Sequence, residues 1–342
     1  MIDKILLFPY YLTLKVRDRF YSRPGRKLHY ADVPTLCIGN VTAGGTGKTP
    51  HVEMVLRLLQ QSDAWGGRQL AVLSRGYKRE STGFQQVTPA GSASIFGDEP
   101  LQIKKKFPDV TVAVDKDRVE GCDAFQYRKL KAARNIVLVD YNRPVHKDLL
   151  LPLGRLRDLP ERIYDADAVI VTKCPAALDD LTRAQFVADM GFTDYLPSGY
   201  DAANPSGRRQ FIFFTTVRYG QAKGVYSTAE PRYLYAKKAI LVTGIAGDGP
   251  LRSYLSDSYK LIKRFSFPDH HSYAWKDISR IQDAVQHDPT AAVLTTEKDA
   301  QRLLDYSGMP ESLMQRLFQV PITVDFLSED EREAFTDFIV HL

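Results

Sequence analysis

The stretch GNVTAGGTGKTP, residues 39–50, decides the fold. A β-rich run at 35–38 precedes it and a helix-period stretch at 50–61 follows, so a strand, a glycine-rich loop and a helix come in that order. In this context the backbone N–H groups of the loop close around phosphate oxygens. The ammonium of Lys48 reaches the β- and γ-phosphates, and the hydroxyl of Thr49 ligates Mg²⁺. The predicted nucleotide-binding residues are Thr42, Ala43, Gly44, Gly45, Thr46, Gly47, Lys48 and Thr49. The pattern GxxxxGK[ST] is broken at one position, because Thr42 stands where the first glycine belongs.

Short β-rich runs alternate with helix-period stretches along most of the chain. Besides 35–38, the β-rich runs are 71–73, 110–114, 136–139, 168–171, 211–214, 239–242 and 292–294. The helix-period stretches are 50–61, 99–106, 178–190, 275–287 and 330–341. This alternation is typical of a mostly parallel sheet covered by helices on both faces, so we expect a doubly wound α/β fold of the P-loop NTPase type.

Polar stretches at 198–209 and 218–231 interrupt the alternation and predict a lobe boundary. The expected parts are an N-terminal interfacial helix in 1–30, a P-loop lobe in 31–215 and a smaller C-terminal α/β lobe in 216–342.

The bulk composition indicates a globular protein. The 342 residues are 44% hydrophobic and 25% charged, which is enough to bury a core. A net charge of +5 fits phosphate-bearing or anionic partners, but no block of Lys and Arg with interleaved aromatic residues predicts a nucleic-acid partner. The three cysteines, Cys37, Cys122 and Cys174, are widely spaced and odd in number, which argues against a disulfide framework and for a reducing compartment.

The N-terminus combines an apolar run at 5–14 with a basic segment behind it. This run is too short to span a bilayer, and no cleavage site of small residues follows, so neither a transmembrane helix nor a secretory signal is predicted. Two alternatives are equally compatible with the pattern: a helix lying in a membrane interface, and an amphipathic helix docked on the protein's own core. Pro9 weakens a single continuous helix. In the membrane alternative the apolar contacts would be Leu6, Leu7, Tyr10, Leu14, Phe20 and Tyr21, and the headgroup contacts Lys4, Lys15, Arg17, Arg19 and Arg23.

Eight short motifs follow one another along the chain: GNVTAGGTGKTP, SRGYKR (74–79), GDEP (97–100), DAFQY (123–127), LLPLGRLRD (150–158), VTGIAG (242–247), FPDHHSY (267–273) and TTEKDAQRL (295–303). In kind and order they resemble the motifs of tetraacyldisaccharide 4'-kinases, the lipid A 4'-kinases. That family carries Thr or Ser where Thr42 stands. The resemblance implies a peripheral enzyme at the cytoplasmic face of the bacterial inner membrane. It would use ATP and Mg²⁺ to phosphorylate the 4'-hydroxyl of an acylated glucosamine disaccharide phosphate, a lipid A precursor.

The resemblance also implies a pair of proton-transfer residues. Asp98 of GDEP would be the general base, and His270 would pair with it, while His271 stays unassigned. A sugar hydroxyl that attacks a γ-phosphate needs a carboxylate or imidazole of this kind within reach. The residues alone favour a helix N-cap as the role of Asp98, and a surface or hydrogen-bonded loop feature as the role of the two histidines.

Further residues resemble the family's phosphate-side groups. Arg157 would stabilise charge on the transferred group, and Asp158 stands where the family has glutamate, as a Mg²⁺-side acid one methylene shorter. In the last motif, the residues 297–299 either contact the nucleotide base or cap the next helix.

Asp123 is the predicted catalytic and metal-side acid of a Walker-B-like element, but here the family pattern breaks. Cys122 replaces the first acid and Tyr127 replaces a histidine, and the chain lacks the helix and strand that the family places before this element. A parallel strand that ends in an acid is how this fold presents a second metal-side carboxylate. We therefore expect either impaired catalysis or recruitment of another segment, for example 110–114, beside the phosphate-loop strand.

Three functions compete at this stage. The first is a lipid-sugar kinase that depends on Mg²⁺ and ATP, and the second is a membrane-associated nucleotide-binding protein with little transfer activity. The third, an unrelated GTPase, rests on a faint likeness of VTKCP (171–175) to a guanine-reading motif, and Pro175 stands where an acid would be needed.

Overall fold

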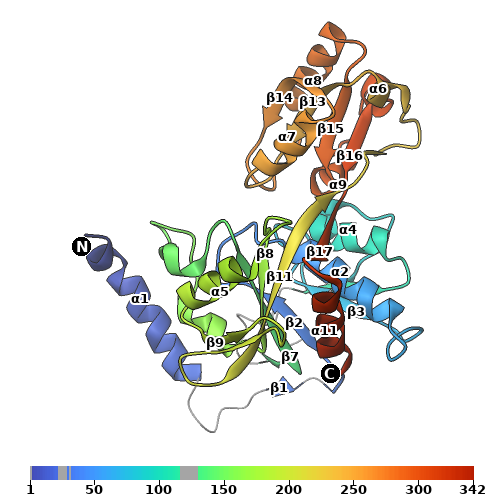
Figure 1. The fold of residues 1–342 in the computed structure, drawn as a ribbon. Coiled ribbons are helices and arrows are strands. Elements are labelled where there is room, and N and C mark those ends of the chain that lie inside the picture. Colours follow the sequence, from blue (N-terminus) through green and yellow to red (C-terminus); the bar gives the residue numbers. More distant parts are fainter. Residues whose placement is uncertain (1, 22–28, 31, 116–129) are drawn as a thin grey trace. The chain divides into compact units, whose positions relative to one another are not determined.

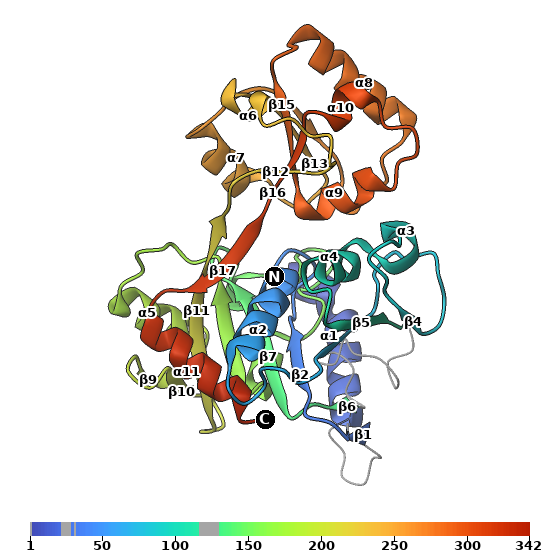
Figure 2. The same ribbon diagram turned by 90° about the vertical axis from the view of Figure 1, so that its right-hand side faces the viewer.

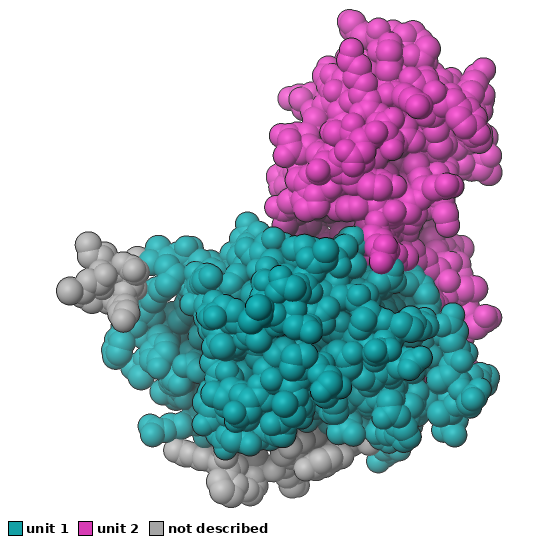
Figure 3. Space-filling view, in the orientation of Figure 1, with its two compact units in different colours: residues 1–68, 117–217, 324–342 teal, residues 69–116, 218–323 magenta. Residues whose placement is uncertain are grey.

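The computed structural model describes residues 2–21, 29–30, 32–115 and 130–342. The chain divides into two compact units, coloured separately in Figure 3. Unit 1 comprises residues 1–68, 117–217 and 324–342, and unit 2 comprises residues 69–116 and 218–323. Residues 69–116, expected in the first lobe, thus group with the second unit, and the C-terminal residues 324–342 group with the first. The chain passes between the two units more than once. Such crossings depend on contacts between residues far apart in the sequence, so a division of the sequence into consecutive lobes does not reveal them.

Unit 1 is built on a sheet with the strand order β2-β7-β8-β11-β10-β9, and β17 pairs with β11. Neighbours from β2 to β11 are parallel, whereas β10 runs antiparallel to both β11 and β9. The strands are β1 (His29–Tyr30), β2 (Leu36–Gly39), β6 (Leu130–Lys131), β7 (Arg134–Asp140), β8 (Ala168–Thr172), β9 (Thr193–Leu196), β10 (Asp201–Ala203), β11 (Arg209–Tyr219) and β17 (Ile322–Phe326). The helices are α1 (Ile2–Tyr21), α2 (Lys48–Gln61), η1 (Val145–Lys147), η2 (Pro160–Asp165), α5 (Asp180–Asp189) and α11 (Glu329–Val340).

Helices cover both faces of this sheet, as the apolar strands require (Figures 1 and 2). On one face Val139, Val171 and Phe214 belong to a core cluster with residues of α1 and α5. On the other face Phe213 packs edge-on against Phe335 of α11, with ring centroids 5.1 Å apart. The predicted mostly parallel α/β fold is confirmed.

One carboxylate lies inside this core. Glu331 of α11 is fully buried, where Oε1 accepts the backbone N–H of Phe214 at 2.5 Å and Oε2 lies 3.6 Å from Nη1 of Arg183. Burial raises the pKa of Glu331 to about 7, against a partial opposing effect of the Phe214 hydrogen bond and the Arg183 charge. Folding therefore favours the protonated form of this side chain.

This burial predicts a pH-dependent stability. Below about pH 4.5 the folded and unfolded states both hold the proton, and the full contribution is present. As the pH rises towards 7 the unfolded chain releases its proton first, so the contribution is lost. We expect Glu331→Gln to gain about 2–3 kcal/mol of unfolding free energy relative to the parent between pH 5 and pH 8, measured by denaturant titration. Glu329→Gln, an exposed neighbour, is the matched control, and a difference that does not change with pH would contradict the assignment.

Unit 2 contains two sheets. The larger has the order β12-β16-β15-β13-β14, parallel except for β12, and the smaller has the order β3-β5-β4. The strands are β3 (Ala71–Ser74), β4 (Gln85–Gln86), β5 (Thr111–Val114), β12 (Lys223–Gly224), β13 (Lys238–Thr243), β14 (Lys260–Ser266), β15 (Ala292–Thr296) and β16 (Leu317–Val320). The helices are α3 (Ala93–Phe96), α4 (Asp98–Lys106), α6 (Arg232–Tyr235), α7 (Gly249–Ser256), α8 (Trp275–His287), α9 (Glu297–Leu304) and α10 (Glu311–Met314). Residues of α8 and of α7 belong to separate core clusters on the two faces of the larger sheet.

The prediction that 110–114 joins the phosphate-loop strand is wrong. This segment forms β5, which pairs with β3 and β4. The neighbour of β2 among the described residues is instead β7. The predicted run 136–139 is the core of that strand, and it is fully buried on both faces as a parallel strand inside a sheet requires.

Helix α1 is continuous through Pro9, and one of its faces docks on unit 1. Leu7 and Leu14 are buried in the core cluster, Tyr10 packs against that cluster, and the hydroxyl of Tyr10 donates to the carbonyl of Arg157 at 3.0 Å. These three residues were expected at a membrane, so that assignment of faces is wrong. Where the structure describes the side chains of α1, the large exposed apolar residues are Phe8, Tyr11, Leu12, Val16 and Phe20.

Candidate active site

The phosphate loop connects β2 to α2, as the sequence predicts. Gly44, Gly45 and Gly47 have positive φ angles of 72°, 63° and 87°, a region that residues with a side chain rarely adopt. Gly47 is the N-cap of α2, and Lys48 and Thr49 begin the helix. The loop therefore has the backbone that a phosphate cradle requires.

A second segment of unit 1 borders the start of the loop. Thr42 forms an isolated β-bridge with Leu156, and the backbone N–H of Ala43 donates to the carbonyl of Arg155 at 2.7 Å. This pairing explains why glycine is not needed at position 42. It also brings Arg157 to the loop.

Asn40 holds two predicted phosphate contacts together. Its Oδ1 accepts from Nη2 of Arg157 at 2.6 Å and from Nζ of Lys48 at 3.1 Å. Its Nδ2 donates to the hydroxyl of Thr46 at 2.7 Å. Two cations thus converge on one buried neutral oxygen beside the loop, an arrangement suited to a polyanionic ligand. Asn40 was not among the predicted site residues, although its position between the strand and the loop is a usable signal.

Asp140 is a second candidate site residue that was not predicted from the sequence. It ends β7, next to β2, where this fold presents a metal-side acid. Lys173 lies 2.6 Å from its Oδ2 and also donates to the carbonyl of Gly45, so the carboxylate is tied to the phosphate loop. In this fold the metal-side acid stands at the end of an apolar strand. The apolar run 136–139 is followed by Asp140, so the same rule that was used for Asp123 selects Asp140.

Asp158 has other partners than a metal. Its Oδ2 lies 2.7 Å from Nη2 of Arg17 on α1 and 3.9 Å from Nε of Arg162, and its side chain is 2% exposed. These contacts connect α1 to the segment that carries Arg157. Arg17, expected at lipid headgroups, is thus paired within the protein. Asp123, Cys122 and Tyr127 lie outside the described residues.

Unit 2 brings Asp98 and His270 together. Asp98 is in the first turn of α4, and its Oδ2 lies 3.1 Å from Nδ1 of His270. On the other side of the ring, Nζ of Lys298 lies 3.1 Å from Nε2. Since an ammonium can only donate, Nε2 is the acceptor and Nδ1 carries the proton that Asp98 accepts. The ring of Tyr77 lies against the imidazole, with centroids 4.9 Å apart.

Cations surround this carboxylate. Nε of Arg302 donates to Oδ2 of Asp98 at 2.8 Å. Burial alone would raise the pKa of Asp98, but the His270 hydrogen bond and the charges of Lys298 and Arg302 together hold it well below its usual range. Burial by itself would lower the pKa of Lys298, since it disfavours the charged ammonium. The carboxylates of Glu99, Asp98 and Asp269 outweigh this effect, and the pKa of Lys298 is raised. The group is thus a network of mutually stabilised charges.

Helix α9 supplies Lys298 and Arg302 to this network. Its start shows the helix cap that is one of the two interpretations of 297–299, and contact with a nucleotide base stays a prediction. The hydroxyl of Thr296 caps α9 by accepting from the backbone N–H of Asp299. Asp299 is fully buried and accepts from the N–H of Gly244, the hydroxyl of Tyr273 and Nη1 of Arg302. The motif therefore caps its helix and holds the cations that face Asp98.

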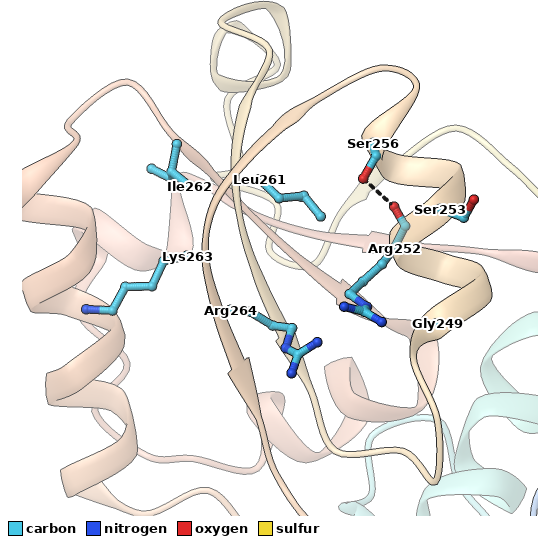
Figure 4. A pocket seen from close by; sticks show the side chains of 8 residues that line it. All are labelled: Gly249, Arg252, Ser253, Ser256, Leu261, Ile262, Lys263 and Arg264. Carbon is cyan, nitrogen blue, oxygen red and sulfur yellow. Dashed lines mark hydrogen bonds between the residues drawn. The ribbon is translucent and has the colours of Figure 1, made fainter.

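A cavity of unit 2 lies elsewhere, between α7 and β14 (Figure 4). It has a volume of about 590 Å³, and Arg252 and Arg264 extend towards it while Lys263 points away. None of the predicted site residues lines it. Among the described residues, no cluster of three or more His, Cys, Asp or Glu side chains could hold a metal, and no helix is long and apolar enough to cross a membrane.

The strand, glycine-rich loop and helix on a mostly parallel sheet define a P-loop nucleotide-binding α/β protein. The chain belongs to the tetraacyldisaccharide-1-phosphate 4'-kinase family, whose model matches residues 4–340. The tetraacyldisaccharide 4'-kinase of Phocaeicola vulgatus is 37% identical, over 95% of this chain and 91% of its own length. That of Parabacteroides distasonis is 33% identical, over 97% and 92%. A crystal structure of LpxK from Aquifex aeolicus, an "apo" form in complex with ATP, shares the fold with a TM-score of 0.70 at 24% identity, over the whole of both chains.

Proposed function

We propose that this chain transfers the γ-phosphoryl group of ATP to the 4'-hydroxyl of an acylated glucosamine disaccharide phosphate. Family membership supports the reaction. The observation that carries the proposal is the Asp98–His270–Lys298 network in unit 2, together with the convergence of Lys48 and Arg157 beside the phosphate loop in unit 1. These groups supply the two parts that phosphoryl transfer needs, charge stabilisation and proton removal.

The phosphate side of the reaction falls to unit 1. The N–H groups of residues 44–49 bind the phosphate oxygens, and Lys48 and Arg157 neutralise the charge that develops on the transferred group. Mg²⁺ prefers oxygen ligands, and the hydroxyl of Thr49 and the carboxylate of Asp140 are the donors here that fit it. When bound there, Mg²⁺ would supply positive charge to the phosphate groups. Asp140 ends the strand beside β2, whereas Asp158 lies outside the strands and pairs with Arg17 of α1, so we assign Asp158 to anchoring that helix.

The proton side falls to unit 2. The acceptor hydroxyl takes the place of Lys298 at Nε2 of His270 and gives its proton to this nitrogen as its oxygen bonds to the γ-phosphorus and the bond to ADP breaks. Asp98 accepts the Nδ1–H and stabilises the imidazolium that forms. This assignment exchanges the predicted roles of the two residues, because the charges that lower the pKa of Asp98 make it a poor base.

We infer that α1 attaches the protein to the cytoplasmic face of the bacterial inner membrane. Phe8, Leu12, Val16 and Phe20 recur every fourth residue on the side away from the buried Leu14, and each is at least 45% exposed. An apolar stripe of this kind suits an acyl-chain interface, and Arg19 beside it suits anionic headgroups. One face of α1 is thus docked on the protein's own core, and the other face is available to a membrane. This arrangement combines the two alternatives that were compatible with the sequence.

This stripe can be tested without removing the helix. Replacing Phe8, Leu12 and Val16 by serine is expected to lower binding to vesicles that contain anionic phospholipid at least tenfold, because each substitution removes apolar area from the interface. ATP affinity should stay unchanged. A control with serine at the exposed Leu181, Leu196 and Tyr235 should bind vesicles like the parent. Sedimentation with vesicles measures both, and equal sedimentation of the two triple variants would refute the assignment.

The reaction itself is tested by incubating the purified chain with γ-labelled ATP, Mg²⁺ and a tetraacylated glucosamine disaccharide 1-phosphate. Label should move to the disaccharide and should not move to an analogue that lacks the 4'-hydroxyl. ATP binding without transfer would favour the alternative, a nucleotide-binding protein with little activity. The observations behind that alternative are the substitution of Cys122 for the family's first acid and the lack of the strand that the family places before this element.

A further inference from the structure

His51, in the first turn of α2, contacts the phosphate loop on the side of its carbonyl oxygens. Its Nδ1 lies 2.7 Å from the carbonyl oxygen of Gly47, and its Nε2 lies 3.0 Å from the hydroxyl of Thr215 on β11. The side chain is 1% exposed. A carbonyl can only accept, so Nδ1 carries the proton and Nε2 accepts from Thr215. Both ring nitrogens are therefore satisfied, and the ring orientation is fixed from both ends.

His51 completes a set of three such contacts. The carbonyls of Gly45, Thr46 and Gly47 are consecutive, and each accepts one side-chain donor. Lys173 donates to Gly45, the hydroxyl of Thr172 donates to Thr46 at 3.1 Å, and His51 donates to Gly47. The donors come from the end of β8, the residue after it, and α2.

Holding these carbonyls orients the opposite edge of the loop. In a trans peptide the C=O and the following N–H point in opposite directions. The N–H groups of Thr46, Gly47 and Lys48 are thus directed away from the three donors, towards the side where phosphate oxygens bind. With Gly45 and Gly47 at positive φ, the backbone has little intrinsic preference for this arrangement. The side-chain donors therefore help to hold it, and at Gly47 the His51 ring acts together with the backbone N–H of His51, which donates to the same carbonyl at 3.2 Å.

We propose that His51 is a positioning residue for nucleotide binding, which holds the Gly47 peptide so that the N–H of Lys48 faces the triphosphate. This proposal rests on the proposed function, but it concerns only the affinity for ATP. Since these N–H groups contact the phosphates before and during transfer, their loss weakens ATP binding more than it slows the chemical step.

The test uses three substitutions at one position. Asparagine places its side-chain NH₂ where Nδ1 lies and keeps the contact to Gly47, whereas glutamine reaches towards Thr215 without it, and alanine keeps neither. We expect His51→Ala and His51→Gln to raise the Kd of Mg–ATP about tenfold by calorimetry and to raise the KM for ATP by a similar factor, with kcat changed less than threefold. His51→Asn should recover most of the affinity. Thr215→Val, which removes only the support of Nε2, should fall in between.

Two results would overturn the proposal. One is an ATP affinity of folded His51→Ala equal to that of the parent, and the other is asparagine performing no better than glutamine. Should the alanine variant fail to fold, as judged by circular dichroism, the asparagine–glutamine comparison decides alone, because both side chains are amides. A parent that binds ATP but transfers nothing would refute the proposed function and leave this comparison valid.

Discussion

Replacement of His270 by alanine is expected to lower kcat for phosphoryl transfer by about 10²–10⁴-fold, the usual contribution of a positioned general base. The imidazole is the group whose Nε2 accepts a hydrogen bond while Nδ1 is held by Asp98, so its removal leaves the attacking hydroxyl without a proton acceptor. The Kd for ATP should stay within about twofold of the parent, because the phosphate loop belongs to the other unit. Steady-state kinetics at saturating ATP and calorimetry with Mg–ATP measure the two effects separately.

The neighbouring histidine provides the control. His271 lies 2.9 Å from Oδ2 of Asp277 and stacks on Phe267, so His271→Ala should affect stability and leave kcat near that of the parent. Asp98→Asn tests the order of roles. If Asp98 only orients and stabilises the imidazole, this variant should lose no more activity than His270→Ala. A far larger loss with Asp98→Asn would identify Asp98 as the base and refute our assignment.

Lys48→Ala is expected to reduce kcat by about 10²–10³-fold, the typical cost of removing one donor from a preorganised site that stabilises developing charge. Nζ of Lys48 shares the oxygen of Asn40 with Arg157, so its removal takes away one of the two described cations at that oxygen. ATP affinity should fall as well, since the ammonium also contacts the phosphates of the bound nucleotide.

The control for Lys48 is a lysine of equal charge away from the loop. Lys147, exposed in η1, serves this purpose, and Lys147→Ala should change neither transfer nor affinity. Filter binding of labelled ATP and transfer assays on both variants complete the comparison. Nucleotide retention by Lys48→Ala equal to that of the parent would mean that the loop does not hold a triphosphate in the proposed way.

The sequence allowed much of the secondary structure to be predicted. All eight β-rich runs are strands, and the stretch 275–287 is helical over its whole length. These predictions succeed because hydrophobic periodicity is strong in buried parallel strands and amphipathic helices. The strand β14 was missed, because as an edge strand it has an exposed, charged pattern that hydrophobic runs do not reveal.

The site was partly predictable for the same kind of reason. The phosphate loop is local, since its glycines, lysine and threonine are neighbours in the chain. The pair of Asp98 and His270 joins residues 172 positions apart, and only the family resemblance connected them. Asn40 and Asp140 were not predicted, because the function of a polar residue at a strand end depends on which strand lies beside it, and that pairing is decided by the fold.

The sequence by itself determined that the chain forms parallel α/β layers and places a glycine-rich loop at residues 42–49 between a strand and a helix, because strand propensity and glycine conformations are local properties. Tertiary structure decided the rest. It selected which face of α1 is buried, gave Arg17 to Asp158, and placed His51 behind Gly47. Such choices depend on which distant side chains a hydrogen bond or an ion pair can reach, and the fold alone fixes those distances.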